Sequence, residues 1–197
     1  MRSMLRKWII IVFDRIAFYL FFKYYYKLKF SNYGDNIRWG RYYYRRTIPS
    51  NVRISCPEKI SIGNNCQFDE FTHLMCHHDG DGLLIGNNVR CSNGFTHITA
   101  FAKVTIEDNV LISAFCQINN GNHGFHDKNL PVMYQTYTKS GEIVIGEGSW
   151  IGRNSHVIGK VKIGKNCIIG ANSVVTKDVP EYSVAVGVPA NAIKRVD

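Results

Sequence analysis

The residues best suited to chemistry lie in one loop, INNGNHGFHDKNLP, which spans residues 118–131. It carries two histidines, His123 and His126, and Asp127 follows the second of them directly. Neutral imidazole has the basicity needed to remove a proton from a hydroxyl group at physiological pH. The loop therefore predicts a general base at His123 or His126, with Asp127 as a candidate orienting partner.

A second set of side chains belongs to the types that bind metals. It consists of the run CHHD at residues 76–79, with Cys66 and His73 upstream. The run contains no CxxC pair and no matching second half, so its spacing is not that of a zinc site. We therefore expect no metal.

A six-residue repeat must position these residues. Small residues stand four places after each repeated aliphatic residue, and Asn, Asp or Gly mostly stands three places after it. Neither a helix, with a period of about 3.6, nor an isolated strand, with a period of about 2, gives such a pattern. It predicts a solenoid of very short strands, in which the aliphatic side chains point inward and stack. These side chains are Ile145, Ile151, Val157, Ile163, Ile169 and Val175.

The same spacing extends toward the N-terminus with interruptions. Ile106, Ile112 and Ile118 are six residues apart, and further hexads begin at Ile62 and Ile85. From Ile118 to Ile145 the separation is 27 residues, so residues 119–141 are expected to protrude as a loop. Loops that leave a regular scaffold often carry function.

Three of the six cysteines occupy the small position of the repeat: Cys66, Cys116 and Cys167. Cys116 lies just before the histidine loop, where a nucleophile would be conceivable. Its place in the repeat instead predicts an inert residue that fills the core. The irregular spacing of the cysteines predicts reduced thiols, as in the cytoplasm.

Residues 1–46 carry the whole excess of positive charge. They contain eleven Lys or Arg and two Asp, whereas residues 47–197 contain thirteen of each sign. A neutral main body argues against a protein that binds nucleic acid.

Residues 5–26 predict a helix. Its apolar core of 15 residues is interrupted by Asp14 and Arg15, and it is too short to span a bilayer. Basic, Tyr and Trp residues flank this helix, which favours a peripheral position at the inner, anionic face of the membrane. The alternative is that residues 1–46 cap the main domain or pack in an oligomer.

Together with the tail GANSVVTKDVPEYSVAVGVPANAIKRV at residues 170–196, the hexads resemble the left-handed parallel β-helix acyltransferases. Within these, the chain is most similar to the galactoside, maltose and cell-surface polysaccharide O-acetyltransferases. The resemblance covers Ile62–Val196. It implies an all-β left-handed parallel β-helix over residues 47–179 with the loop 119–141 protruding. The remaining parts are an α-helical extension at residues 1–46 and a C-terminal tail at residues 180–197.

The resemblance also implies an activity: direct transfer of an acetyl group from acetyl-CoA to a hydroxyl of a sugar, polysaccharide or lipid-linked glycan precursor. His123 follows Ile118 by five residues, which is the offset of the catalytic histidine in the resembled enzymes. His123 is therefore the expected general base, and His126 is the second candidate, on the acceptor side. Asn93 corresponds to an asparagine that contacts the acceptor sugar, or else it only turns the backbone beside Gly94.

In the resembled enzymes the coenzyme lies in a groove between adjacent solenoids, which implies a homotrimer. The expected coenzyme-binding residues are, from the thioester outward, Trp150, Arg153, Ala171, Thr176, Lys177 and Lys194. Lys194 stands where the family often has arginine. It supplies a point charge to the nucleotide phosphates but not a bidentate fork.

Three alternatives stay open. Gamma-type carbonic anhydrases share the solenoid and bind a metal, but they lack the VVTKDVP and GVPA segments of this tail. A small hydroxyl compound such as serine is an alternative acceptor. A scaffold protein without catalytic activity is the third alternative, and the histidine loop argues against it.

Overall fold

The computed structural model describes residues 33–34, 37–39 and 51–196. Tyr33–Asp197 forms one compact unit of the chain. The predicted helix and most of the basic N-terminal segment lie outside the described residues. Within the described ranges, no helix is long and apolar enough to span a membrane.

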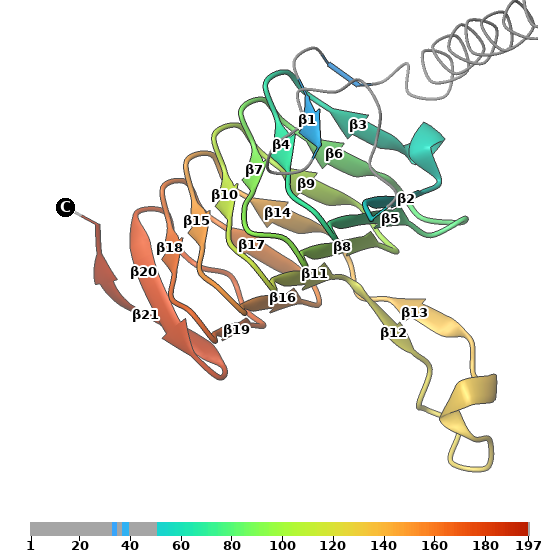
Figure 1. Ribbon diagram of the computed structural model, residues 1–197. Coiled ribbons are helices and arrows are strands. Elements are labelled where there is room, and N and C mark those ends of the chain that lie inside the picture. The colour runs from blue at the N-terminus through green and yellow to red at the C-terminus, as the bar shows by residue number, and fades with distance from the viewer. Residues whose placement is uncertain (1–32, 35–36, 40–50, 197) are drawn as a thin grey trace, which may run out of the picture. The chain divides into compact units, whose positions relative to one another are not determined.

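Short parallel strands stack into a three-faced solenoid, as Figure 1 shows. The first face contains β3 (Ile60–Ile62), β6 (Leu83–Ile85), β9 (Val104–Ile106), β14 (Ile143–Ile145) and β17 (Val161–Ile163). The second face contains β1 (Arg38–Trp39), β4 (Gln67–Phe68), β7 (Arg90–Cys91), β10 (Leu111–Ile112), β15 (Trp150–Ile151), β18 (Ile168–Ile169), β20 (Ser183–Gly187) and β21 (Ala190–Arg195). The third face contains β2 (Arg53–Ser55), β5 (His73–Cys76), β8 (His97–Ala100), β11 (Gln117–Asn119), β16 (His156–Ile158) and β19 (Val174–Val175).

These stacked coils confirm the parallel β-helix that the hexads predict. The described residues contain two short 3-10 helices, η1 (Pro57–Lys59) and η2 (Val132–Tyr134), and no α-helix. At the C-terminal end, β20 extends the second face and β21 folds back antiparallel on it. Near the N-terminal end, β1 pairs with β4, and Trp39 stacks on Phe68 with ring centroids 5.1 Å apart.

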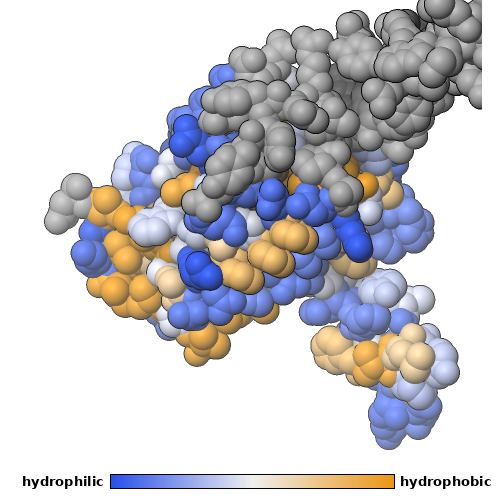
Figure 2. All heavy atoms as spheres, in the orientation of Figure 1, coloured by the Kyte–Doolittle hydropathy of each residue, from blue (hydrophilic) through white to orange (hydrophobic). Residues whose placement is uncertain are grey.

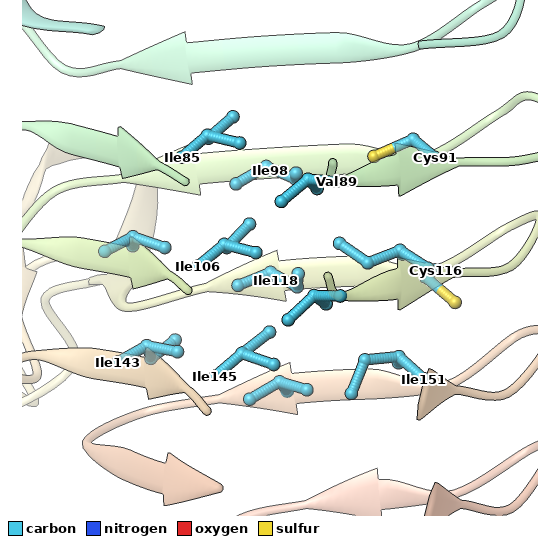
Figure 3. Packing of buried hydrophobic residues seen from close by; sticks show 14 of the residues in the cluster. Ile85, Val89, Cys91, Ile98, Ile106, Cys116, Ile118, Ile143, Ile145 and Ile151 are labelled. Atoms are coloured by element: carbon cyan, nitrogen blue, oxygen red, sulfur yellow. The ribbon is translucent and has the colours of Figure 1, made fainter. Parts of the chain in front are cut away.

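The core is a column of repeated aliphatic side chains, one from each face of each coil. Ile85, Ile106 and Ile145 stand opposite one another in adjacent strands and stack, as Figure 3 shows. Ile98 and Ile118 form a second column in the same way. Each fully buried isoleucine contributes roughly 1.5–3 kcal/mol to stability. Since a coil buries its inner face only against its neighbours, the repeat holds together as a stack.

The corners confirm the positions that the repeat assigns to small and turn-forming residues. Asn154, Asn166 and Asn172 all have positive φ angles, a conformation that asparagine tolerates better than most residues. The Nδ2 of Asn154 donates to Oδ1 of Asn172 in the next coil, at 2.8 Å. Buried Ser149 and Ser155 donate to backbone carbonyls of the following coil, each at 2.9 Å.

Candidate active site

The histidine loop is a two-stranded arm that leaves the solenoid after β11 and returns before β14. Its strands β12 (Gly121–His123) and β13 (Tyr137–Lys139) pair antiparallel, and Figure 1 shows the arm projecting from the stacked coils. An isolated hairpin is at best marginally stable in water. The arm can therefore hold a catalytic group in place only through its contacts with the body.

Asn120 clamps the base of the arm. Its side chain is fully buried, and its Oδ1 accepts hydrogen bonds from the backbone N–H groups of Phe101 and Ala102, at 2.9 and 3.1 Å. Its Nδ2 donates to the carbonyls of Lys103 and Gly141, at 3.0 and 2.9 Å. The amide thus ties the exit and the return of the arm to one turn of the preceding coil.

Gly121, the first residue of β12, lies against the ring of Phe101. A Cβ atom at this position would overlap the ring, so the close approach requires glycine. The backbone of the arm consequently packs directly on an aromatic side chain of the body.

Tyr137 and Lys139 provide a second set of contacts farther along the arm. The ring of Tyr137 lies 5.5 Å from Phe101 and 5.7 Å from His77, measured between centroids. Lys139 Nζ donates to the carbonyl of Asp79 at 2.6 Å and to Oδ1 of Asp81 at 3.0 Å. One face of the arm is thereby fixed to the segment of residues 77–81.

His123 stands on this same face of the arm. It pairs with Tyr137 across the two strands, and the ring centroids are 4.5 Å apart. The imidazole is exposed, and in the part of the chain that the structure describes no hydrogen bond to it is found. Its ring nitrogens therefore have no hydrogen-bond partner among the described residues.

The second candidate, His126, lies beyond the paired strands with its ring 4.6 Å from that of Phe125. The carboxylate of Asp127 accepts a hydrogen bond from the backbone N–H of Asn129 at 2.9 Å, which forms a local turn. Among the described residues, neither histidine is hydrogen-bonded to Asp127. The orienting role considered for this carboxylate is therefore not formed within one chain.

A groove of about 270 Å³ opens at the base of the arm. Its lining combines the arm with the third face: Asn119, Gly121, Asn122, Ile158, Gly159 and Thr176. Thr176 is one of the residues expected to line the coenzyme site. The structure thus brings one expected coenzyme contact to the foot of the arm that carries His123.

The other expected coenzyme contacts are exposed at different places. Trp150 starts β15, and its Nε1 donates to Oγ of Ser113 at 2.9 Å. Arg153 follows at the next corner, with its guanidinium 4.8 Å from the ring centroid of Phe115. Ala171, Lys177 and Lys194 are exposed, and Lys194 lies on β21.

Asn93 turns the chain. Its φ angle is +66°, and its backbone N–H donates to Oδ2 of Asp69 at 2.6 Å. Asp69 is buried and also accepts from Nε2 of Gln67 at 2.9 Å. The backbone of Asn93 therefore turns the chain here, and its side chain takes no part in these bonds.

His77, His78 and Asp79 form a cluster in which the imidazole nitrogens and the carboxylate oxygen, atoms that can bind metals, lie within 4.8 Å of one another. His77 Nδ1 is hydrogen-bonded to Oδ1 of Asp79, and this bond is the main cause that lowers the pKa of the Asp79 carboxyl. Two ammonium groups compete with a cation here, because Lys59 and Lys139 both bond carbonyls of the same segment. The sequence does not relate this cluster to His123, because only the fold brings both His77 and His123 to Tyr137.

Cys116 is buried, and its thiol donates to the carbonyl of Gly152 at 3.1 Å. Burial raises the pKa of this thiol, so it stays protonated and is a poor nucleophile.

Comparison with known proteins gives a consistent result. The family described as bacterial transferase hexapeptide (six repeats) matches residues 142–177. A putative lipopolysaccharide biosynthesis O-acetyltransferase of Escherichia coli is 32% identical over 149 residues, which are 72% of this chain and 71% of the relative. The galactoside O-acetyltransferase of Escherichia coli is 35% identical over 60% of this chain and 56% of its own length.

A probable acetyltransferase of Mycobacterium tuberculosis is 36% identical over 58% of this chain. The match spans 36% of that relative, so the chain corresponds to only part of it. Among solved structures, an N-acyltransferase from Bacillus cereus in complex with dTDP and coenzyme A superposes with a TM-score of 0.70. It is 22% identical, and the superposition covers 89% of both chains, which shows a shared fold.

Proposed function

Because the chain belongs to the bacterial hexapeptide-repeat acyltransferases, we propose that it transfers an acetyl group from acetyl-CoA to a hydroxyl of a sugar or glycan precursor. The observation that carries the proposal is the exposed His123 on an anchored arm, whose foot borders a groove lined by Thr176. The names of the relatives support the substrates, since they include O-acetyltransferases of lipopolysaccharide biosynthesis and of galactosides.

In the proposed reaction His123 acts as general base. Its neutral imidazole takes the proton of the acceptor hydroxyl while the oxygen attacks the thioester carbonyl. The tetrahedral oxyanion is stabilised by backbone N–H groups. When the intermediate collapses, the carbon–sulfur bond breaks and the imidazolium returns the proton to the thiolate of coenzyme A. No acyl-enzyme is formed, in keeping with the buried and protonated Cys116.

The acetyl-CoA is proposed to bind between two copies of the chain, within a homotrimer. Trp150 starts β15 of the second face and Arg153 follows at the next corner, whereas the groove with Thr176 lies at the foot of the arm. The tip of the arm exposes Phe125, Met133 and Tyr134 by 63%, 73% and 66%. Figure 2 shows apolar side chains gathered on this arm. A second copy that covers the tip would remove this apolar surface from water and bring His123 beside the neighbouring coenzyme.

The acetyl transfer is tested with the full chain and acetyl-CoA against a panel of sugars, sugar nucleotides and polyprenyl-linked sugars, with serine included. Release of coenzyme A thiol and a matching acetyl mass on the acceptor are expected for a sugar hydroxyl. Acetylation of serine alone would replace the glycan proposal. Hydrolysis of acetyl-CoA without any acetylated acceptor would contradict it.

A peripheral position at the inner face of the membrane is the last part of this proposal. It depends on the charge and aromatic content of residues 1–46. The full chain should co-sediment with vesicles that contain phosphatidylglycerol, and a chain that begins at Tyr33, which keeps four of the eleven basic residues, should co-sediment more weakly. This truncation keeps Trp39, which packs in the core on Phe68. Equal co-sedimentation of both chains would contradict the membrane role.

A further inference from the structure

A second groove, of about 320 Å³, opens over the first strands of the third face. Its lining consists of Asn51, Arg53, Phe71, His73, Phe95 and His97. Arg53, His73 and His97 stand directly opposite one another on β2, β5 and β8. The two imidazole rings stack, with centroids 4.3 Å apart. The groove thus presents one guanidinium and two imidazoles side by side.

The charge of this groove is unbalanced. None of the six lining residues is a carboxylate, and among the described ion pairs Arg53 takes part in none. Burial lowers the pKa of His73, and the charges of His97 and Arg53 lower it further. A bound anion would offset the repulsion between these positive charges. Arginine and protonated histidine both form strong hydrogen bonds with phosphate oxygens.

An exposed column of phenylalanines joins this groove to the proposed coenzyme contacts. Phe71, Phe95 and Phe115 stack with centroids 4.6 and 5.1 Å apart, and Arg153 lies over the last ring at 4.8 Å. Each of the three rings is exposed by 43–46%. Each residue also has a positive φ angle, which costs roughly 1–2 kcal/mol for a residue with a side chain. Strained and exposed aromatic residues contribute little to stability, so a binding role accounts for them better.

From these contacts we propose that the groove binds the phosphoryl or diphosphate group of the acceptor, whose sugar then extends along the phenylalanine column toward Arg153. This inference rests on the proposed acetyl transfer and narrows its acceptor to a phosphate-activated sugar. Asn93 lies in the same turn as Phe95, at the place where the sugar passes. Asn51 also lines the groove, and its buried Oδ1 has no hydrogen-bond donor among the described residues.

The first test measures binding of inorganic pyrophosphate to the full chain by calorimetry. We expect R53Q and H73Q each to weaken binding about tenfold or more, which corresponds to about 1.4 kcal/mol. H156Q is the matched control, because His156 continues the same column of residues two strands beyond His97 and lies outside the groove. Thermal melting identifies any variant that fails to fold, and H97Q then replaces it. Unchanged binding in folded R53Q and H73Q, or an equal loss in H156Q, would overturn the proposal.

The second test separates the two sources of such a diphosphate. The full chain is incubated with a nucleoside diphosphate, or with phosphatidylcholine vesicles that contain a polyprenyl diphosphate, and inhibition of pyrophosphate binding is measured. Inhibition by the first indicates a sugar nucleotide as acceptor, and inhibition by the second indicates a lipid-linked sugar. If neither inhibits, the groove does not hold an acceptor diphosphate.

The kinetic outcome distinguishes the failure of this inference from the failure of the acetyl transfer. With a phosphate-bearing acceptor, R53Q should raise the KM for the acceptor about tenfold and leave the KM for acetyl-CoA unchanged. Full acetylation activity with an unchanged acceptor KM in R53Q would overturn the groove and keep the acetyl transfer. Pyrophosphate binding that depends on Arg53, in a chain that acetylates no acceptor, would overturn only the acetyl transfer.

Discussion

Tyr137 is the residue that most directly restricts where the imidazole of His123 can lie. Its ring touches His123 on the arm as well as Phe101 and His77 on the body. The His77 imidazole is itself held by its bond to Asp79. Misplacement of a catalytic group by about 1 Å can cost about a hundredfold in rate. If His123 acts as the proposed base, this aromatic cluster sets how well the base is positioned.

Replacing Tyr137 with alanine should lower kcat about tenfold or more and leave the KM for acetyl-CoA nearly unchanged, because the arm loses its ring contacts. Y137F keeps the ring and should restore most of the rate. Steady-state kinetics of the two variants check this. A rate in Y137A equal to that of the unaltered chain, or a loss in Y137F as large as in Y137A, would contradict a positioning role for the ring.

Single functional residues could be predicted from the sequence where they occupy a position of the repeat or match an offset known from the resembled family. His123 could be chosen because its distance from Ile118 is fixed along the chain. Tyr137, His77 and Asn120 could not, because their importance depends on contacts between segments tens of residues apart. For Asn93 the sequence left two interpretations equal, and both stand, because the bond to Asp69 involves only the backbone N–H of Asn93.

The elements of the solenoid follow from the repeat, whereas the arm does not. The six-residue spacing of residues such as Ile145 and Ile151 marks the inward position of each short strand, and both are fully buried. The arm has no such period. Its antiparallel pairing and its direction depend on Asn120, Gly121 and Lys139, each of which contacts another coil. Sequence could therefore predict that residues 119–141 leave the solenoid, but not how they are held.

The clamp at the base of the arm predicts a measurable loss of stability. In N120A the N–H groups of Phe101 and Ala102 and the carbonyls of Lys103 and Gly141 lose their buried partner. The free energy of unfolding should fall by about 2–3 kcal/mol. Urea unfolding followed by circular dichroism measures the change.

N129A is the matched control, since Asn129 is exposed near the tip of the arm. It should unfold at the same urea concentration as the unaltered chain. Surface substitutions usually change the free energy of unfolding by less than about 0.5 kcal/mol. A difference between N120A and the control within this range would contradict the clamp.

For the whole molecule, the described residues form a solenoid with its own buried core and an arm whose tip exposes apolar side chains. The buried column of aliphatic side chains runs through all coils of the stack, as Figure 3 shows for part of it. Exposed apolar residues clustered on a projecting arm are typical of an interaction surface, and we propose that a second copy of the chain covers them. The sequence could predict this partner only through the family resemblance, because the hexads themselves describe one chain.

We expect light scattering of the full chain to give a molar mass three times that of one chain. M133S should shift it toward smaller species, since Met133 is the most exposed large apolar residue of the tip. L84S is the control and should leave the mass unchanged, because Leu84 is exposed on β6 of the first face and is not part of the arm. A single chain mass for the unaltered protein at micromolar concentration would contradict the trimer.

The central claim is that His123 is the base of an acetyl transfer, and turnover of H123A measured together with coenzyme A binding tests it most directly. H123A should lose about a hundredfold or more in kcat, the scale of general base catalysis, while it binds coenzyme A as tightly as the unaltered chain. H126A, changed at the neighbouring histidine of the same arm, should keep most of its rate. Near-normal turnover in H123A, with the loss appearing in H126A instead, would contradict the account.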